Sequence, residues 1–274
     1  MATNQMRREA AKRKLAGQQA RRAQQVARRR RIAVISSVAV VVVVLVGVVL
    51  LSTVGRSGDA PAPTAPSDAA AAAPAAPGTC AYPAGESAAR PNQPPQTDGV
   101  SNEGTATVAL ATSAGPIGLT LDRAQAPCTV NSFVSLAGQG YFDGTTCHRL
   151  TTGEGLKVLQ CGDPTGTGTG GPGYTIPDEP PTTLAASPSG AGTVVYPRGT
   201  VAMAKTAAPN SGGSQFFLVY ADSTLPPDYT VFGTIDEAGL ATVDKVAAGG
   251  SDDANGQGDG KPKTSVTIES ATIS

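Results

Sequence analysis

The sequence contains one histidine, His148, and no tryptophan among its 274 residues. Its four cysteines include no C-x₂-C pair, so the usual nitrogen and sulfur ligand set of a structural zinc site is missing. The acidic stretch 252–260 lacks the downstream glutamate and the ligand spacing of an EF-hand. The glycine-rich run after Asp163 lacks the Gly-Lys-Ser/Thr ending of a phosphate-binding loop. We therefore expect no metal and no other cofactor, and we interpret 252–260 as a flexible acidic loop.

Net charge is also absent, because 21 basic residues balance 21 acidic ones. The charges are nevertheless segregated. Residues 1–31 contain eleven Lys and Arg residues but only one acidic residue, Glu9, which leaves ten basic and twenty acidic residues for the rest. Such a tail can be a nucleic-acid-binding arm. We favour the simpler interpretation of a basic flank that lies on anionic lipid beside a membrane segment, and we expect no nucleic acid partner.

Residues 32–54 contain no charged residue and consist mainly of Val, Ile and Leu. As a helix they would be about 34 Å long, enough to cross a hydrocarbon core of about 30 Å. Four arginines precede the segment and only Arg56 follows closely, so the positive-inside rule places the N-terminus in the cytoplasm. A cleaved signal peptide is the alternative, but its apolar region is usually only about 7–15 residues long. We expect a single-pass anchor in the cell membrane, with the rest of the chain outside the cytoplasm.

Ala, Pro, Gly, Ser and Thr make up nearly all of residues 55–78, and polar, Pro-rich sequence continues to about residue 103. Such a stretch cannot bury enough apolar surface to offset the entropy of ordering it, so it should be a semi-extended tether. The sequence therefore predicts a basic cytoplasmic tail (1–31), a transmembrane helix (32–54), an extracytoplasmic linker (55–103) and a folded part (104–274). The folded part has a size that suits one domain with one core.

Strand patterns dominate this folded part. Residues 106–111 and 117–121 alternate between apolar and other residues on either side of a turn, as in a hairpin. One helix should begin at Pro127, and a second should span about 236–247 before a pair of glycines. The last strand is expected at 265–273. Many short antiparallel strands with two helices suggest a closed barrel that the helices cap.

The stretch 144–171 has the pattern of a hairpin with polar side chains that could bind a ligand on both arms. His148 and Arg149 lie on one arm and Gln160 lies on the other, with glycines in the turn between them. An arginine and a glutamine on adjacent strands can offer two different donors to one carbonyl group. This arrangement suits a peptide substrate.

Six short motifs follow one another in this part of the chain. They are F-V-S-L-A-G-Q-G-Y-F-D-G-T (133–145), H-R (148–149), Q-C-G-D-P-T-G-T-G (160–168), G-T-V-A-M-A (199–204), P-N-S-G-G-S-Q-F-F (209–217) and V-F-G (231–233). Together and in this order they resemble the cyclophilin family, over about residues 105–274. The resemblance implies a closed eight-stranded antiparallel barrel with two capping helices, and isomerisation of X-Pro peptide bonds.

The resemblance also implies roles for single residues. Arg149 matches the catalytic arginine of the family, Gln160 the glutamine that binds the substrate backbone, and Phe217 the aromatic floor of the proline pocket. His148 is only the neighbour of the catalytic arginine, so we expect a structural role for it. Six further substrate-binding candidates follow from the resemblance. Ala204 and Gln215 match positions that bind the substrate backbone, and Met203 is the core-facing methionine beside Ala204. Val158, Leu225 and Tyr229 match positions of the proline pocket.

The sequence departs from the family pattern around the expected pocket. Lys157 and Val158 stand where an aromatic residue and a methionine usually precede the glutamine. Leu225, followed by Pro226, stands where Trp or Phe is common, and Tyr229 takes a position that His often holds. The pocket therefore keeps its aromatic floor but has less aromatic wall, which leaves two functions open.

The first is a peptidyl-prolyl cis-trans isomerase that acts on Pro-containing segments of exported proteins. Its arginine would stabilise the twisted amide, and the chemistry needs no nucleophile, base or metal. The alternative is a chaperone module that binds Pro-containing segments and has little catalytic activity. In either case we expect a monomer held to the membrane by one helix.

Four cysteines beyond the membrane segment favour disulfides, because this part of the chain is expected outside the cytoplasm. Three pairings are possible. Cys147 and Cys161 lie on the two arms of the predicted hairpin, where a bridge would brace the strands of the arginine and the glutamine. Cys80 would then pair with Cys128 and tie the end of the linker to the first helix, and this is the pairing that we favour.

Overall fold

The computed structural model describes residues 78–190 and 192–274. The predicted basic tail, the predicted transmembrane helix at 32–54 and the predicted linker up to residue 77 lie outside these residues. Among the residues that are described, no helix is long and apolar enough to cross a membrane.

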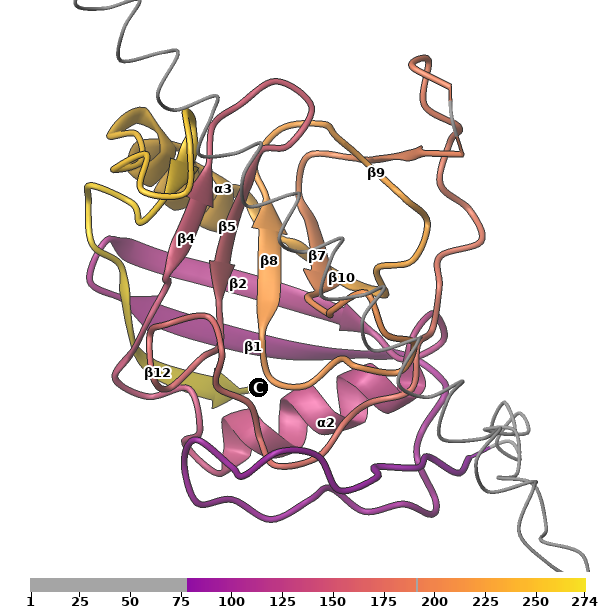
Figure 1. The fold of residues 1–274 in the computed structure, drawn as a ribbon. Coiled ribbons are helices and arrows are strands. Elements are labelled where there is room, and N and C mark those ends of the chain that lie inside the picture. The colour runs from indigo at the N-terminus through magenta and orange to yellow at the C-terminus, as the bar shows by residue number, and fades with distance from the viewer. Residues whose placement is uncertain (1–77, 191) are drawn as a thin grey trace, which may run out of the picture. The chain divides into compact units, whose positions relative to one another are not determined.

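Twelve strands and two helices occur in the described part of the chain (Figure 1). In chain order they are β1 (Thr105–Thr112), β2 (Gly115–Asp122), α2 (Pro127–Gly138), β3 (Thr145–Thr146), β4 (Arg149–Thr151), β5 (Val158–Cys161), β6 (Val194–Tyr196), β7 (Thr200–Met203), β8 (Phe216–Val219), β9 (Ser223–Leu225), β10 (Val231–Ile235), α3 (Glu237–Ala248), β11 (Asp259–Gly260) and β12 (Thr267–Ile273).

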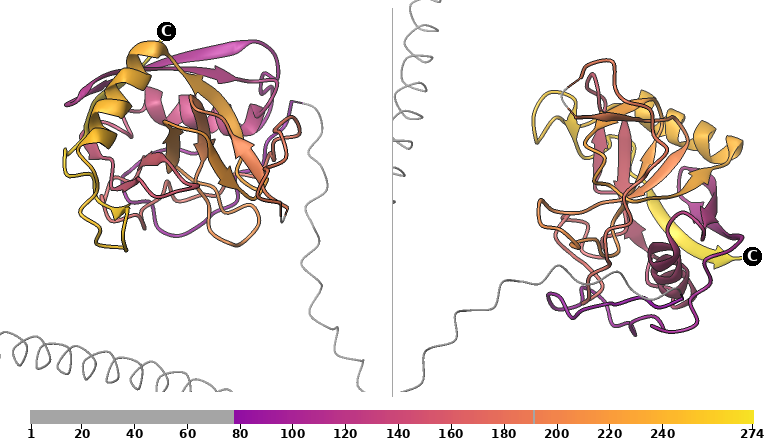
Figure 2. Two further views of the ribbon diagram at one scale, coloured as in Figure 1. Left: turned by 90° about the horizontal axis from the view of Figure 1, so that it is seen from above. Right: turned by 90° about the vertical axis from the view of Figure 1, so that its right-hand side faces the viewer.

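Ten of these strands form one antiparallel sheet in the order β11-β4-β5-β8-β7-β10-β2-β1-β12-β3, and β6 pairs with β9 separately. The end strands β11 and β3 have two residues each, and in the described structure they do not pair with each other. The chain runs from the edge strand β3 through only Cys147 and His148 into β4, which is the neighbour of the other edge strand, β11. The sheet is a curled half-barrel around the core (Figure 2). The predicted mainly-β fold with two helices is confirmed, whereas the predicted closed eight-stranded barrel is wrong.

The predicted hairpin at the start of the domain is confirmed as β1 and β2, which pair along their whole length. Every second residue of β1 is buried, including Val108 and Leu110, and Ile117 and Leu119 of β2 are buried in the same way. This alternation directs one face of each strand to the core.

Both predicted helices are present. α2 begins at Pro127, as expected, and the Glu179 carboxylate accepts hydrogen bonds from the backbone N–H groups of Cys128 and Thr129 at 2.9 Å each, in the manner of an N-cap. α3 begins after Asp236, whose side chain accepts a bond of 2.7 Å from the backbone N–H of Gly239. These bonds satisfy backbone donors that have no partner inside the helix.

An aromatic cluster fills the core between α2 and the sheet. The ring centroid of Phe133 on α2 lies 4.8 Å from that of Phe142, 5.1 Å from that of Phe216 and 5.3 Å from that of Phe232. All four side chains are buried. α2 is therefore held against the concave side of the sheet by aromatic contacts, which are worth about 0.5–1.5 kcal/mol per pair beyond the area they bury.

Residues 78–103 fall within the predicted linker, but they lie along α2, as the indigo chain in Figure 1 shows. Cys80 forms a disulfide with Cys128 at the start of α2, and the Tyr82 hydroxyl donates to the carbonyl of Cys128 at 2.9 Å. The Arg90 guanidinium donates to three turn carbonyls after α2, those of residues 140, 141 and 143, at 2.7–3.2 Å. Residues 78–103 thus pack on the folded domain, which was predicted to begin only at residue 104.

Candidate active site

The strand registers bring the predicted catalytic arginine and two predicted substrate-binding residues into one row. Arg149 on β4 lies opposite Gln160 on β5, Gln160 lies opposite Phe217 on β8, and Phe217 lies opposite Ala202 on β7. Residues opposite each other in antiparallel strands project from the same face. The row therefore presents a guanidinium, an amide and an aromatic ring side by side on the outer face of the sheet.

This outer face has a small apolar cluster of its own. Phe217 packs there with Val158, Tyr196 and Val219. The residues between them in the same strands, such as Leu159 and Leu218, belong to the main core on the other face. The period of two along each strand therefore separates a core face from a site face.

The Arg149 guanidinium is oriented by two hydrogen bonds to the carboxylate of Asp259. The guanidinium donates through Nε to Asp259 Oδ1 at 2.8 Å and through Nη2 to Oδ2 at 2.7 Å, and Nη1 lies 3.4 Å from Gln160 Oε1. The bidentate hydrogen bond that Arg149 donates to Asp259 raises the pKa of Arg149, and the same bond lowers the pKa of the Asp259 carboxyl. The pair is therefore fully ionised at neutral pH, with a fixed direction for the guanidinium.

Sequence reasoning missed Asp259. The residue lies in the acidic stretch that was expected to be a flexible loop, but Asp259 and Gly260 form β11 and pair with Thr151 and Leu150 of β4. Composition gave no signal for this contact, because it joins residues 110 positions apart. Among the described residues, no cluster of three or more potential ligands could hold a metal ion.

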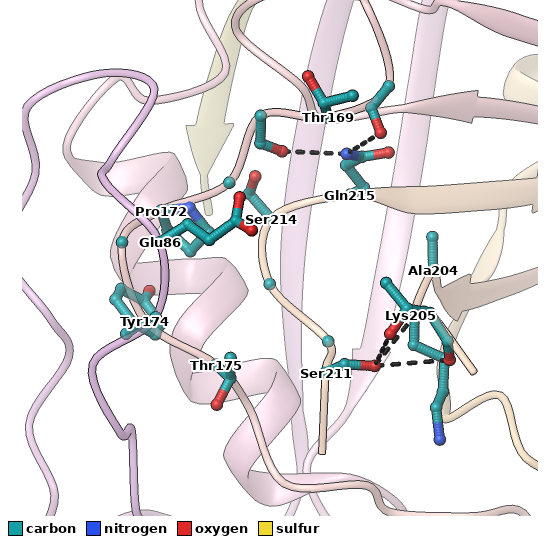
Figure 3. A pocket seen from close by; sticks show the side chains of 18 of the residues that line it. Glu86, Thr169, Pro172, Tyr174, Thr175, Ala204, Lys205, Ser211, Ser214 and Gln215 are labelled. Carbon is teal, nitrogen blue, oxygen red and sulfur yellow. Dashed lines mark hydrogen bonds between the residues drawn. The ribbon is translucent and has the colours of Figure 1, made fainter. Parts of the chain in front are cut away.

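Gln160 is fixed by a second glutamine. Its Nε2 donates to Gln215 Oε1 at 2.9 Å, and Gln215 Nε2 donates to the carbonyls of Gly168 and Gly170 at 3.0 Å each (Figure 3). Because the two carbonyls fix the orientation of the Gln215 amide, they also fix that of the Gln160 amide. Gln215 thus orients the Gln160 amide, and it also lines a second pocket beside Gln160.

A small pocket of about 140 Å³ opens in front of the row. An engineered apolar cavity of about 150 Å³ holds benzene, so this space suits a five-membered ring. Phe217 and Tyr229 form an edge-to-face pair with ring centroids 5.7 Å apart. Nine residues line the pocket, namely Arg149, Leu156, Val158, Gln160, Ala204, Lys205, Phe217, Leu225 and Tyr229.

Seven of the nine lining residues were predicted from the sequence, and only Leu156 and Lys205 were missed. Two predicted residues, Gln215 and Met203, do not line this pocket. Met203 is buried in the main core, because it follows Ala202 in β7 and therefore points to the opposite face.

Lys157 stands at the departure from the family pattern, yet it does not line the small pocket. Its Nζ donates to the carbonyl of Thr152 across the β4–β5 turn at 3.0 Å, and its backbone N–H donates to Ser223 Oγ at 3.0 Å. The ammonium is thus held at the turn, and the apolar side chain of Val158 faces the pocket instead.

Two disulfides are present, Cys147–Cys161 and Cys80–Cys128, and these are the pairs that the sequence analysis favoured. Cys161 directly follows Gln160, and Cys147 lies two residues before Arg149. The first bridge therefore joins the segment that leads into β4 to the end of β5, directly behind the arginine and the glutamine.

His148 lies between this disulfide and Arg149 but does not line the pocket. Burial is the main cause that lowers the pKa of its imidazole, so the ring is neutral at neutral pH. Its position agrees with a structural role and gives it no access to a substrate in the pocket.

The sequence matches one protein family and is similar to several bacterial proteins. The model of the family described as cyclophilin type peptidyl-prolyl cis-trans isomerase/CLD matches residues 107–273. A relative from Mycobacterium leprae (strain TN), named probable peptidyl-prolyl cis-trans isomerase B, is 54% identical over 198 residues, which are 71% of this chain and 66% of the relative. The protein of the same name from Mycobacterium tuberculosis (strain ATCC 25618 / H37Rv) is also 54% identical, over 71% of this chain and 63% of the relative.

The alignment thus spans slightly less than two thirds of these mycobacterial proteins. A peptidyl-prolyl cis-trans isomerase of Helicobacter pylori (strain ATCC 700392 / 26695) is 41% identical over 53% of this chain and 82% of its own length. Among solved structures, a cyclophilin type isomerase of Cryptosporidium parvum matches with a TM-score of 0.51 and 29% identity, covering 62% of this chain and 98% of that chain.

Proposed function

The chain belongs to the cyclophilin type peptidyl-prolyl cis-trans isomerase family, whose model matches residues 107–273, and we propose that it accelerates cis–trans rotation about X-Pro bonds. The observation that carries this proposal is the row of Arg149, Gln160 and Phe217 in front of a pocket of about 140 Å³. It offers an apolar site for a proline ring and donors for the amide that precedes it.

The reaction itself requires only rotation. An amide resists it with a barrier of about 18–20 kcal/mol, because resonance gives the C–N bond partial double-bond character. In the twisted state resonance is lost and the nitrogen regains a lone pair. A guanidinium that donates a hydrogen bond to this nitrogen or to the displaced carbonyl stabilises the twisted state more than either planar state. Stabilisation by about 7 kcal/mol would accelerate rotation on the order of 10⁵-fold.

Arg149 has donors to spare for this task. Of the five N–H groups of a guanidinium, Asp259 takes two and Gln160 is within reach of one more. The remaining N–H groups can donate to a bound amide. Because Asp259 grips Nε and Nη2, the guanidinium need not be ordered again each time a substrate binds, and this preorganisation supports catalysis.

The walls of the pocket also favour the isomerase over a binding module with little activity. Val158 and Leu225 are smaller than the aromatic residues or methionine expected in the family, but Leu156 adds apolar surface and Tyr229 packs edge-to-face on Phe217. Apolar side chains therefore still form a large part of the pocket wall, and Lys157 does not line it.

A coupled assay distinguishes the two functions. The full chain in detergent micelles is added to an X-Pro peptide whose trans form alone is cleaved by a protease, and the slow phase is followed. The isomerase accelerates the slow phase in proportion to its concentration. A chaperone module would bind the same peptide, as fluorescence anisotropy would record, and leave the slow phase at the uncatalysed rate. That second result would refute the proposed activity.

For its cellular setting, we propose a single-pass anchor at 32–54, a cytoplasmic N-terminus and an extracytoplasmic domain that acts, as a monomer, on Pro-containing segments of exported proteins. The two disulfides support this side of the membrane, because such bonds persist in oxidising compartments. Protease added to intact cells should digest the domain and spare an epitope tag at the N-terminus. Protection of the domain in intact cells, with digestion after lysis, would contradict this orientation.

A further inference from the structure

A second, larger pocket adjoins the small one. Its volume is about 630 Å³, and the two pockets share Gln160, Ala204 and Lys205. A peptide whose proline occupies the small pocket can therefore place a neighbouring residue in the larger one, since an extended chain advances by about 3.3 Å or slightly more per residue.

One wall of the larger pocket comes from outside the part of the chain that the family model matches. Residues 85–87 line it, whereas the match begins at residue 107. This wall pairs with the loop opposite in antiparallel fashion, through bonds from Gly85 N–H to the Gly173 carbonyl at 3.0 Å and from Ala89 N–H to the Gly171 carbonyl at 2.9 Å. An N-terminal segment is thus built into the rim of the candidate active site.

The segment fits closely against the loop and is held firmly. Gly173 has φ +88°, and a Cβ atom there would lie 3.0 Å from the Cβ of Ala88, so glycine allows the close approach. The Cys80–Cys128 disulfide precedes the wall, and the three bonds from Arg90 to turn carbonyls follow it. The wall is therefore fixed on both sides.

Two charged residues line the larger pocket, Glu86 and Lys205. Lys205 is neutralised, because its Nζ lies 2.6 Å from Asp178 Oδ2. Glu86 is exposed and forms no ion pair with any residue in the described ranges. In Figure 3 its side chain extends past Pro172 toward Ser214, whereas the Lys205 side chain runs away from it. The unbalanced charge of this pocket is thus the carboxylate of Glu86.

We propose that the larger pocket is a subsite for a basic side chain, Lys or Arg, in the residues flanking the target proline, and that Glu86 is its specificity-determining residue. This inference rests on the proposed isomerase function of the adjoining pocket. What it adds is a selectivity supplied by the N-terminal segment, through attraction between a carboxylate and a cationic side chain.

The test uses Ala-rich X-Pro peptides in which one Lys or one Glu is moved through the three positions before and the three positions after the proline. For the wild-type full chain in detergent micelles, we expect kcat/KM for Lys to exceed that for Glu about two- to fivefold at one or two adjacent positions at low salt, because the carboxylate is exposed. The preference should shrink at high salt.

Variants that change the charge of residue 86 then test whether Glu86 causes the preference for Lys. Glu86→Gln should remove the preference for Lys over Glu, and Glu86→Lys should reverse it. Glu103→Gln is the matched control, because Glu103 is an exposed carboxylate of the same N-terminal segment that does not line the pocket; it should keep the wild-type preference.

An equal Lys-to-Glu ratio in the wild type and in Glu86→Lys at every position would overturn the subsite. Failure of the isomerase function would look different, since the all-Ala peptide would then isomerise at the uncatalysed rate. In that case the binding affinities of the same peptides for the wild type and Glu86→Lys would still decide whether the subsite exists.

Discussion

Asp259 offers the sharpest test of how the site is organised. Its carboxylate holds Arg149 Nε and Nη2 at 2.8 and 2.7 Å, and the Asp259 and Arg149 side chains are 28% and 34% exposed. A hydrogen bond to a charged group is worth about 1.5–3 kcal/mol when it is buried. Because solvent screens a pair that is exposed to this extent, we discount each bond to about 1 kcal/mol.

Replacement of Asp259 by Ala therefore releases about 2 kcal/mol of restraint, which alone would lower the population of the productive guanidinium position about 30-fold. Loss of the Asp259 charge should by itself raise kcat/KM, because the negative carboxylate no longer weakens the electrostatic effect of Arg149 on the bound amide. We expect a net loss in kcat/KM of about tenfold for Asp259→Ala, whereas Asp259→Asn keeps one acceptor and should lose only about threefold.

The measurement is the protease-coupled isomerase assay, together with thermal unfolding of each variant. Asp244→Ala is the matched control, because Asp244 forms a similar bidentate pair with Arg198 away from the pocket. It should leave kcat/KM unchanged. If Asp259→Ala were as active as the wild type or more active, Asp259 would only dampen the charge of Arg149, and the positioning argument would be refuted.

Three further predictions concern Phe217 at the floor of the small pocket, the Cys147–Cys161 disulfide and His148. Phe217→Ala should raise KM more than it lowers kcat, because the ring mainly binds the proline; steady-state kinetics decide this, and a loss confined to kcat would speak against a pocket floor. The double variant Cys147→Ser/Cys161→Ser opens a loop of 14 residues in sequence separation and should lower the free energy of unfolding by about 3 kcal/mol in urea titrations; an unchanged midpoint would show that the brace is dispensable. Because burial lowers the pKa of His148, the folded domain should lose stability as the pH falls below about 6.5, and His148→Asn should reduce this loss between about pH 7 and pH 5; equal losses in both proteins would disprove it.

The sequence predicted the parts of the site that lie close together along the chain or within family motifs. Arg149 and Gln160 are eleven residues apart on one hairpin, so alternation and turn residues sufficed to bring them together. Phe217 required the resemblance to a family, because nothing in the local pattern pairs β8 with β5. Met203 lies in the core, as expected for the core-facing methionine of its motif, and it therefore does not line the small pocket.

What sequence reasoning could not predict depends on long-range registers. Asp259 reaches Arg149 only because β11 pairs with β4, and a two-residue strand carries no periodic signal. The wall at 85–87 lies in Pro-rich sequence without apolar periodicity, and its position depends on a disulfide and on the space that Gly173 leaves. The expected barrel closure failed for a related reason, because the pairing of the sheet edges is decided by strands of two residues.

The central claim is that the Arg149 guanidinium stabilises the twisted amide. NMR exchange spectroscopy on an X-Pro peptide measures the rate of interconversion at equilibrium, without a coupling protease, for the wild type and for Arg149→Ala. We predict a loss on the order of 10²- to 10³-fold in Arg149→Ala, as for removal of one donor that acts on a transition state. Equal rates in the two proteins would contradict the account.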